Sequence, residues 1–516
     1  MLRWRVMMLV CVLSGGYAAA RADAQPTFGR PKETRPRESK PGEDPNRIES
    51  DPTMARVAED WRDEDPERTA PSAEATPGIW YAWKTAESFR YGWSLPATYE
   101  KGQGYDLIVL LHPDGADFRW GIANHPRVER DTPPDRAFRV ENLLVSVDGV
   151  TAGSRRPEQR KFECTPENAV KFRDVLLEFA RTLPVRRMYL YGVGGGGRFA
   201  AYFSNMFPAL ADGVLDHGGG IADNAAVMST VPIVFMHGAK DSMTPPARSV
   251  RAKDEYESAG HKGVRVRLLR GYNDFLNPVR ASECLDYLQG MRADDADEAV
   301  DYAVRMLTAK PADEFDYRCP VWYAGAYEVL NRVVRGEGFE NPPPESARAR
   351  AAALIKRIDD EGAGHVARVR ELMGPGDASS LALDGGPWLG YLVALRDDFR
   401  GVKPVSEFMA EIGLDAVVAR QEAAAAELAT AWADAISDRQ KFETAMALLP
   451  GCFLVETLPV DLGARLRACY RKADELELSS ESRDRFEYLS LLERGQRDGL
   501  EEYQQVWERW RVGDTE

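Results

Sequence analysis

A run of four glycines at residues 194–197 is the first feature of the sequence that could carry chemistry. It follows an apolar run at 188–191 and precedes an amphipathic stretch, which predicts a strand, a sharp turn and a helix. Such a turn can hold a nucleophile above a parallel sheet, in the pattern Gly-x-Ser-x-Gly. It can also cradle the phosphates of a dinucleotide, in the pattern Gly-x-Gly-x-x-Gly. The two chemistries require different residues.

The glycine run fits both patterns in part. Gly192, Gly194 and Gly197 satisfy the dinucleotide pattern, and Asp216 follows at the end of the next apolar run. In the nucleophile frame the outer glycines are present, but Gly194 takes the nucleophile position and has no side chain. A dinucleotide fingerprint normally opens its domain, whereas at least four predicted strands precede this turn. A nucleotide-binding protein is therefore the less favoured alternative.

Three histidines, His112, His217 and His237, lie at the carboxyl ends of neighbouring predicted strands. These ends meet at one edge of a parallel sheet, where ligands bind. The histidines, with Asp216 or Asp241, could form a replacement catalytic or metal cluster. Because no ligand spacing such as His-Glu-x-x-His is present, we favour loop histidines bonded to the backbone, and we expect no metal and no cofactor.

The elements that must position these residues alternate between strand and helix from residue 79 to residue 290. After an opening hairpin at 79–95, the predicted strands are 107–111, 143–147, 188–191, 213–215, 233–236 and 264–269. The predicted helices are 165–182, 198–207, 246–259 and 278–289. This alternation predicts an α/β fold with a mostly parallel sheet and helices on both faces.

The rest of the chain divides into three further segments. Residues 1–24 resemble a signal peptide, with Arg3 and Arg5 before a short apolar run and a small-residue cleavage site near Ala24. Residues 25–77 are rich in proline and charge and predict a disordered linker. Residues 291–516 lose the strand signal and predict an all-helical domain, a possible surface for a protein partner. The α/β domain is then 78–290, and we expect a periplasmic or extracellular protein.

Composition excludes several classes of function. The formal net charge is −15, and no lysine- or arginine-rich cluster is interleaved with aromatic residues, so we expect no nucleic-acid partner. No stretch has the length of a membrane span. The cysteines lack Cys-x-x-Cys spacing, which argues against zinc. Cys452 and Cys469 are the closest candidates for a disulfide.

An ordered set of motifs in residues 79–290 resembles the α/β-hydrolase superfamily, especially secreted esterases similar to polyhydroxybutyrate depolymerases or dienelactone hydrolases. Residues 110–115, Leu-Leu-His-Pro-Asp-Gly, resemble the oxyanion loop, and residues 192–197 resemble the nucleophile elbow. Residues 237–245 resemble the acid loop, with Asp241 as the acid. Residues 271–274 resemble the histidine loop. The resemblance implies an α/β-hydrolase-like sheet followed by the helical domain.

The resemblance also shows which catalytic residues are missing. It places Gly194 at the nucleophile position and Asn273 or Asp274 at the histidine position, so that only Asp241 of the triad remains. The family mechanism needs a nucleophile whose proton passes to an imidazole oriented by the acid. Two such losses predict a catalytically inactive protein that binds a ligand or another protein. Glycine at the elbow would also remove backbone strain.

A binding pocket could be retained although the catalytic triad is lost. The oxyanion donors are backbone N–H groups, expected near Gly195 and Gly115, and they need no particular side chain. We therefore expect a small ligand carrying a carbonyl or carboxylate group, in a pocket shared with the three histidines. An active esterase with unconventional residues remains an alternative, although Ser204 and Ser242 lie on no elbow. Asp274, if it lay beside Asp241, would raise the pKa of one carboxyl.

Overall fold

The computed structural model describes residues 69–84, 90–124, 141–149, 161–221, 223, 230–238, 241, 244, 246–269, 278–308, 321–373, 389–417 and 419. All of them belong to one compact unit, Val57–Glu516. The predicted signal peptide, most of the linker and residues 420–516 lie outside the described residues, so the division into four segments and the export of the protein stay predictions. Within the described ranges, no helix combines the length and apolarity that crossing a membrane requires.

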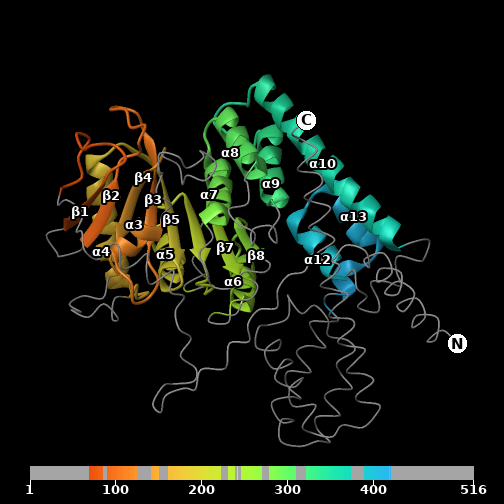
Figure 1. The fold of residues 1–516 in the computed structure, drawn as a ribbon, viewed down its shortest axis with the longest axis horizontal. Helices are drawn as coiled ribbons and strands as arrows, with labels where there is room; N and C mark the ends of the chain where they lie inside the picture. Colours follow the sequence, from red (N-terminus) through yellow and green to blue (C-terminus); the bar gives the residue numbers. More distant parts are fainter. Residues whose placement is uncertain are drawn as a thin grey trace, which may run out of the picture. The chain divides into compact units, whose positions relative to one another are not determined.

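The described core of the molecule is an eight-stranded sheet (Figure 1). Its strands are β1 (Trp80–Lys84), β2 (Arg90–Ser94), β3 (Tyr105–Leu111), β4 (Leu143–Val147), β5 (Val185–Val193), β6 (Gly213–His217), β7 (Ile233–Gly238) and β8 (Val264–Leu269). Their order is β1-β2-β4-β3-β5-β6-β7-β8. The β1–β2 and β2–β4 pairs are antiparallel, and the other pairs are parallel. The predicted fold class, an α/β-hydrolase-like and mostly parallel sheet, is confirmed.

The central strand β3 shows why the apolar runs form this sheet. It pairs with β4 on one side and with β5 on the other, and all seven of its residues are buried. Ile108 and Leu110 face one apolar cluster, whereas Leu107, Val109 and Leu111 face another. A strand buried on both faces needs apolar residues at every position, which produces a continuous run instead of alternation.

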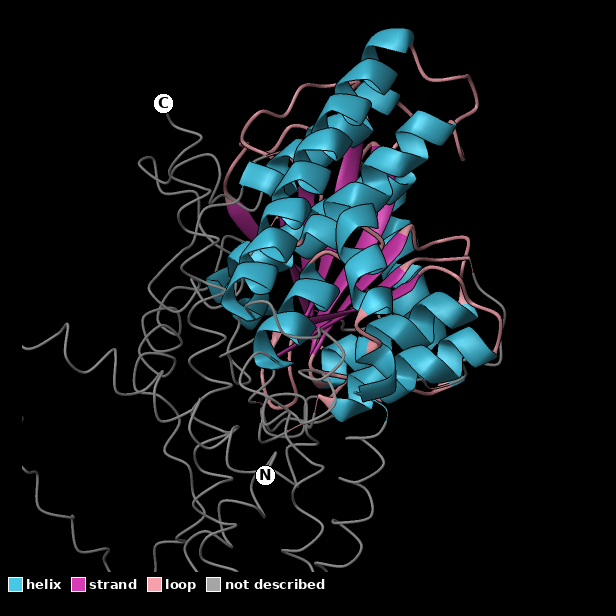
Figure 2. Cartoon of the chain, turned by 90° about the vertical axis from the view of Figure 1, so that its right-hand side faces the viewer, coloured by secondary structure: helices cyan, strands magenta, loops and turns pink. Residues whose placement is uncertain are grey.

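Helices supply the two outer layers (Figure 2). One face packs against α4 (Pro166–Thr182), α5 (Gly195–Met206) and α6 (Ala247–Ser258), and its apolar cluster includes Phe172, Phe199 and Tyr256. The start of α4 is fixed by the Thr165 side chain, which accepts a hydrogen bond from the N–H of Asn168. Two further helices are α3 (Phe118–Asn124) and α7 (Pro278–Arg292).

The helices after the sheet share its core. They are α8 (Ala296–Thr308), α9 (Tyr323–Arg335), α10 (Glu345–Met373), α12 (Leu389–Asp398) and α13 (Lys403–Glu411). Leu330 and Leu395 of these helices belong to the same apolar cluster as Ile108 and Leu215 of the sheet. The described part of 291–419 is thus helical, as predicted, and it is joined to the sheet by continuous apolar packing.

Candidate functional site

The turn between β5 and α5 has the conformation of a nucleophile elbow, with Gly194 at its tip. Gly194 has φ +55° and ψ −119° and precedes the first residue of α5. Its N–H donates to the carbonyl of His217 at 2.8 Å, and its carbonyl accepts from the N–H of Arg198 at 3.1 Å. A side-chain-bearing residue in such a conformation costs about 1–3 kcal/mol, whereas glycine adopts it freely.

Gly192 and Gly196, on either side of the tip, have no space for a side chain, whereas Gly194 at the tip does. A Cβ built on Gly192 would lie 2.3 Å from the carbonyl carbon of Gly196, and one built on Gly196 would lie 2.5 Å from the carbonyl oxygen of Leu111. A Cβ on Gly194 would meet only the Cβ of Pro113, at 3.8 Å. No other atom of the described residues lies within 4 Å of that Cβ, so the described residues leave the place of a nucleophile's side chain open.

A carboxylate lies against the predicted oxyanion site. A Cβ on Gly195 would fall 2.3 Å from Oδ1 of Asp114, so this carboxylate lies directly over the first turn of α5. Asp114 is exposed, and its charge adds to that of the hydrogen-bonded Asp223 in raising the pKa of Arg198. Gly115, the other predicted oxyanion residue, is exposed with φ +87°. Pro113 in the same loop has no N–H to donate.

Asp241 is buried after β7, where the acid of the triad was predicted. Its Oδ1 accepts from the N–H of Thr244 at 2.8 Å, and its Oδ2 lies 3.1 Å from Nε2 of His237. The acid thus pairs with an imidazole on the preceding strand. Asn273 and Asp274, predicted at the histidine position, lie outside the described residues, as does Ser242.

Both ring nitrogens of His237 are engaged in hydrogen bonds. Nδ1 lies 2.7 Å from Oγ of Ser249 on α6, and Nε2 lies 2.7 Å from the carbonyl of Thr244. Because Nε2 faces both that carbonyl and the carboxylate of Asp241, it carries the proton. Nδ1 of the neutral ring then accepts from the Ser249 hydroxyl. This fully buried ring connects β7, α6 and the acid loop.

His112 plays a similar part at the ends of β3 and β4. It is fully buried, with Nδ1 2.8 Å from the carbonyl of Pro113 and Nε2 accepting from the N–H of Gly149 at 2.8 Å. These contacts are to the backbone and place the ring as a link between two strand ends. Ser204, considered as an alternative nucleophile, is buried within α5 and donates to the carbonyl of Ala201.

Asp216 and His217 form a buried titratable pair beneath the elbow. Asp216 accepts from the N–H groups of Gly219 and Gly220, at 2.7 and 3.1 Å. Burial raises the pKa of Asp216 to about 7. Burial and then the nearby His237 lower the pKa of His217 to about 4, and its Nδ1 has no hydrogen-bond partner among the described residues. The Asp216 side chain therefore stabilises the loop that follows β6, through its hydrogen bonds to the backbone of Gly219 and Gly220.

The surroundings of the elbow contain residues that the sequence analysis missed. Arg198, in the first turn of α5, forms an ion pair with Asp223 that joins two nitrogens to both carboxylate oxygens. Burial and then the charge of Asp223 raise the pKa of Cys164 to about 12, so its thiol stays protonated at neutral pH. Asp114 lies within the motif at 110–115 and Arg198 directly follows the motif at 192–197, which was the available signal. In the described part of the chain, no three histidine, cysteine or acidic residues are grouped to hold a metal.

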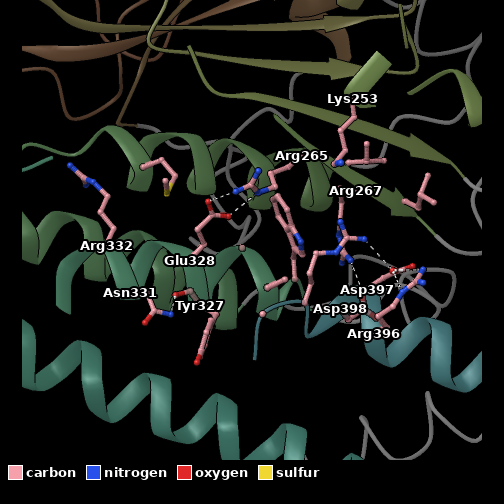
Figure 3. Close-up of a pocket in the computed structure, with 18 of the residues that line it drawn as sticks. Lys253, Arg265, Arg267, Tyr327, Glu328, Asn331, Arg332, Arg396, Asp397 and Asp398 are labelled. Carbon is pink, nitrogen blue, oxygen red and sulfur yellow. Dashed lines mark hydrogen bonds and ion pairs between the residues drawn. The ribbon is translucent and has the colours of Figure 1, made fainter. Parts of the chain in front are cut away.

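A cavity of about 850 Å³ lies away from these residues (Figure 3). It is lined by parts of α6, β8 and α9 and by the end of α12. None of the site residues predicted from the sequence lines it. Ion pairs cross the lining, among them Arg265 with Glu328 and Arg267 with Asp398.

Comparison with known proteins gave structural likeness only. No family model matches the chain, and no curated protein matches it. A thermostable esterase is 17% identical over 38% of this chain, with a TM-score of 0.29, and this chain spans only 54% of its length. Esterase PE8 is 21% identical over 36% of this chain and 92% of its own, with a TM-score of 0.28. A ferulic acid esterase from Anaeromyces mucronatus is 13% identical over 42% of this chain and 92% of its own, with a TM-score of 0.31. The strand order and the elbow at Gly194 themselves give this chain the α/β-hydrolase fold.

Proposed function

We propose that this protein uses an α/β-hydrolase fold to bind a ligand at the elbow without cleaving it. The observation that carries the proposal is Gly194, which stands at the tip of an intact elbow and offers no side chain where the described residues leave room for a nucleophile. Acyl transfer in this family's manner begins with attack by that side chain. Glycine supplies no attacking atom.

The proton acceptor of a triad has no evident replacement among the described residues. The acid Asp241 interacts with His237, and both ring nitrogens of His237 are engaged with Ser249, Thr244 and Asp241. His112 is held by backbone groups, and His217 is buried with a pKa of about 4. A triad imidazole must direct one ring nitrogen at the nucleophile, whereas the nitrogens of His237 are directed at Ser249, Thr244 and Asp241.

The ligand would be recognised at the amino end of α5. Backbone N–H groups at a helix start favour an oxygen acceptor, and they would select a carbonyl or carboxylate. The Asp114 carboxylate beside Gly195 adds negative charge at the same place. We therefore favour a neutral carbonyl compound over a carboxylate. We further propose that the protein is exported and that the helices after the sheet present a surface to a protein partner.

A second candidate function is ester hydrolysis with Asp114 as the base. Its carboxylate is exposed and lies against Gly195, the residue after the elbow tip, and its charge acts on Arg198. A water molecule there could give a proton to Asp114 while its oxygen attacks an ester carbonyl. The proton would then pass to the departing alcohol.

Purified full-length protein should be assayed against p-nitrophenyl acetate and butyrate and with a fluorophosphonate probe. The binding proposal expects hydrolysis at the rate of buffer and no labelling. Turnover that is lost in Asp114→Asn, but retained in the exposed control Asp254→Asn, would replace it with the second function. Calorimetry with NAD tests the nucleotide-binding alternative, for which we expect no heat of binding.

A further inference from the structure

The 850 Å³ cavity beside β8 is a second candidate binding site, independent of the elbow (Figure 3). Its volume lies in the range of about 300–1,000 Å³ that is typical of small-molecule sites. It borders β8, the last strand in the sheet order, and the face of α9 that carries Glu328 and Arg332. Apolar side chains such as Met291 and Trp322 contribute to the same lining.

The lining is basic although the chain as a whole is acidic. Seven of the described lining residues are lysine or arginine, whereas five are aspartate or glutamate. The chain carries a formal net charge of −15. The central arginines are neutralised: Arg265 makes two bonds to Glu328, at 2.9 and 2.5 Å, and Arg267 pairs with Asp398 at 2.7 Å. The excess positive charge lies elsewhere in the lining.

Arg332 is a buried cation that makes no direct ion pair with a described carboxylate, although the charge of Asp294 acts on it from farther away. Its side chain is held by three carbonyl oxygens, those of Gly290, Ala293 and Gly338, at 2.9–3.0 Å. The ring of Phe339 lies 3.9 Å from its guanidinium carbon. Burial lowers the pKa of Arg332, although it remains protonated at neutral pH. Carbonyl dipoles hold this guanidinium in place without cancelling its formal charge.

Two further arginines are exposed and only loosely paired. The side chains of Arg335 and Arg400 are 64% and 57% exposed. Their closest acidic atoms lie 3.7 Å away on Glu337 and 3.4 Å away on Asp397. Exposed pairs of this kind contribute about 0–1 kcal/mol, so an incoming anion can replace the acidic partner at small cost.

We propose that this cavity binds an organic anion, with a carboxylate, sulfonate or phosphate group held by the excess arginines and an apolar body against the apolar lining. The fixed guanidinium of Arg332 supplies charge whose position is set before the ligand arrives. Arg335, three residues later on α9, and Arg400, two residues after α12, add attraction at the rim. Arg265 and Arg267, whose charges are paired with Glu328 and Asp398, line the cavity without attracting the anion.

Titration calorimetry on the full chain tests this site with naphthalene-2-sulfonate and its neutral counterpart naphthalene-2-sulfonamide. We expect one site per chain, at least tenfold tighter binding of the sulfonate, and weaker sulfonate binding at high salt. The double variant Arg335→Gln/Arg400→Gln should weaken sulfonate binding at least threefold and leave sulfonamide binding unchanged.

The control is Arg348→Gln/Arg370→Gln, which removes two exposed arginines of α10 that do not line the cavity. It should bind both compounds as the natural protein does. Thermal unfolding of each variant shows whether the fold is intact. Equal binding of the two compounds, no binding of the sulfonate, or equal losses in test and control variants would overturn the proposal without touching that for the elbow.

Discussion

The carboxylate of Asp114 lies over the backbone of Gly195, so near that a Cβ at residue 195 would fall 2.3 Å from Oδ1. The amino end of α5, where an oxyanion would otherwise be stabilised, already has a negative charge beside it. Glycine at 195 is what leaves room for that carboxylate. The close approach of Asp114 to Gly195 therefore links the glycine run to the charge of the ligand that the elbow can accept.

Neutralising Asp114 should change which ligands bind at the elbow. In Asp114→Asn, the affinity for benzoate should rise by roughly three- to tenfold relative to benzamide, because Asp114 is exposed and two charges about 4 Å apart in water interact by about 1 kcal/mol. Competition calorimetry with the two compounds measures the ratio. An unchanged ratio, matching that of the control Asp254→Asn, would mean that Asp114 does not face the ligand.

Gly194→Ser should destabilise the protein. The described residues leave room for the new side chain, but φ of +55° would cost a serine about 1–3 kcal/mol. Thermal unfolding should show a lower midpoint than in the control Gly104→Ser, where φ is not left-handed and the nearest atom lies 3.5 Å away. A midpoint that is unchanged or raised would refute the strained geometry. The serine alone should give no esterase activity, since none of the described imidazoles lies within 4 Å of a Cβ at residue 194.

Asp216 should make the free energy of unfolding depend on pH. Its pKa is about 7 in the fold and about 4 in the unfolded chain, so the fold favours the protonated carboxyl. That contribution is complete below pH 4 and is lost as the pH rises to 7. His217, with a pKa of about 4 in place of 6.5, contributes in the opposite sense: its stabilisation is present above pH 6.5 and lost on acidification towards pH 4.

The two effects separate in single variants studied by chemical denaturation at pH 4, 5, 6 and 7. Relative to the natural protein, Asp216→Asn should gain stability steadily as the pH rises, and His217→Gln should lose it. Each change should amount to a few kcal/mol over the range, at about 1.4 kcal/mol per pKa unit. Parallel pH profiles for all three proteins would contradict the buried titrations.

The buried pair of Arg267 and Asp398 should be essential to the junction between β8 and α12. Both side chains are almost fully buried and lie 2.7 Å apart. Asp398→Asn leaves the buried guanidinium of Arg267 with the more distant carboxylate of Glu283, at 3.6 Å, and should cost up to about 3–5 kcal/mol. Asp415→Asn, which disrupts an exposed pair with Arg396, should cost about 1 kcal/mol or less. Similar losses of unfolding free energy in the two variants, measured by urea denaturation, would show that the buried pair stabilises the fold no more than the exposed pair does.

The sequence predicted the sheet well because buried parallel strands leave a continuous apolar run. The run at 107–111 became β3, and the glycine run became the elbow. The start of β5 was predicted three residues late, because Arg186 and Arg187 interrupt the apolar pattern. Their guanidinium groups pair with Asp106, which the sequence places 80 residues away.

The contacts of the site could not be predicted in the same way. The interaction of His237 with Ser249 depends on how α6 packs against β7, and local periodicity carries no information about that packing. Asp114 was visible in its motif, yet only the fold shows that its carboxylate turns towards Gly195. Strand positions follow from local hydrophobicity, whereas side-chain partners follow from the arrangement of several elements.

The apolar cluster that joins Ile108 and Leu215 to Leu330 and Leu395 has a practical consequence for anyone wishing to express the elbow region alone. A fragment that ended at residue 290 would expose to water the apolar side chains of the sheet layer that the later helices cover. Exposed apolar patches of this kind promote aggregation. Redesign of that layer with polar side chains would have to precede the truncation.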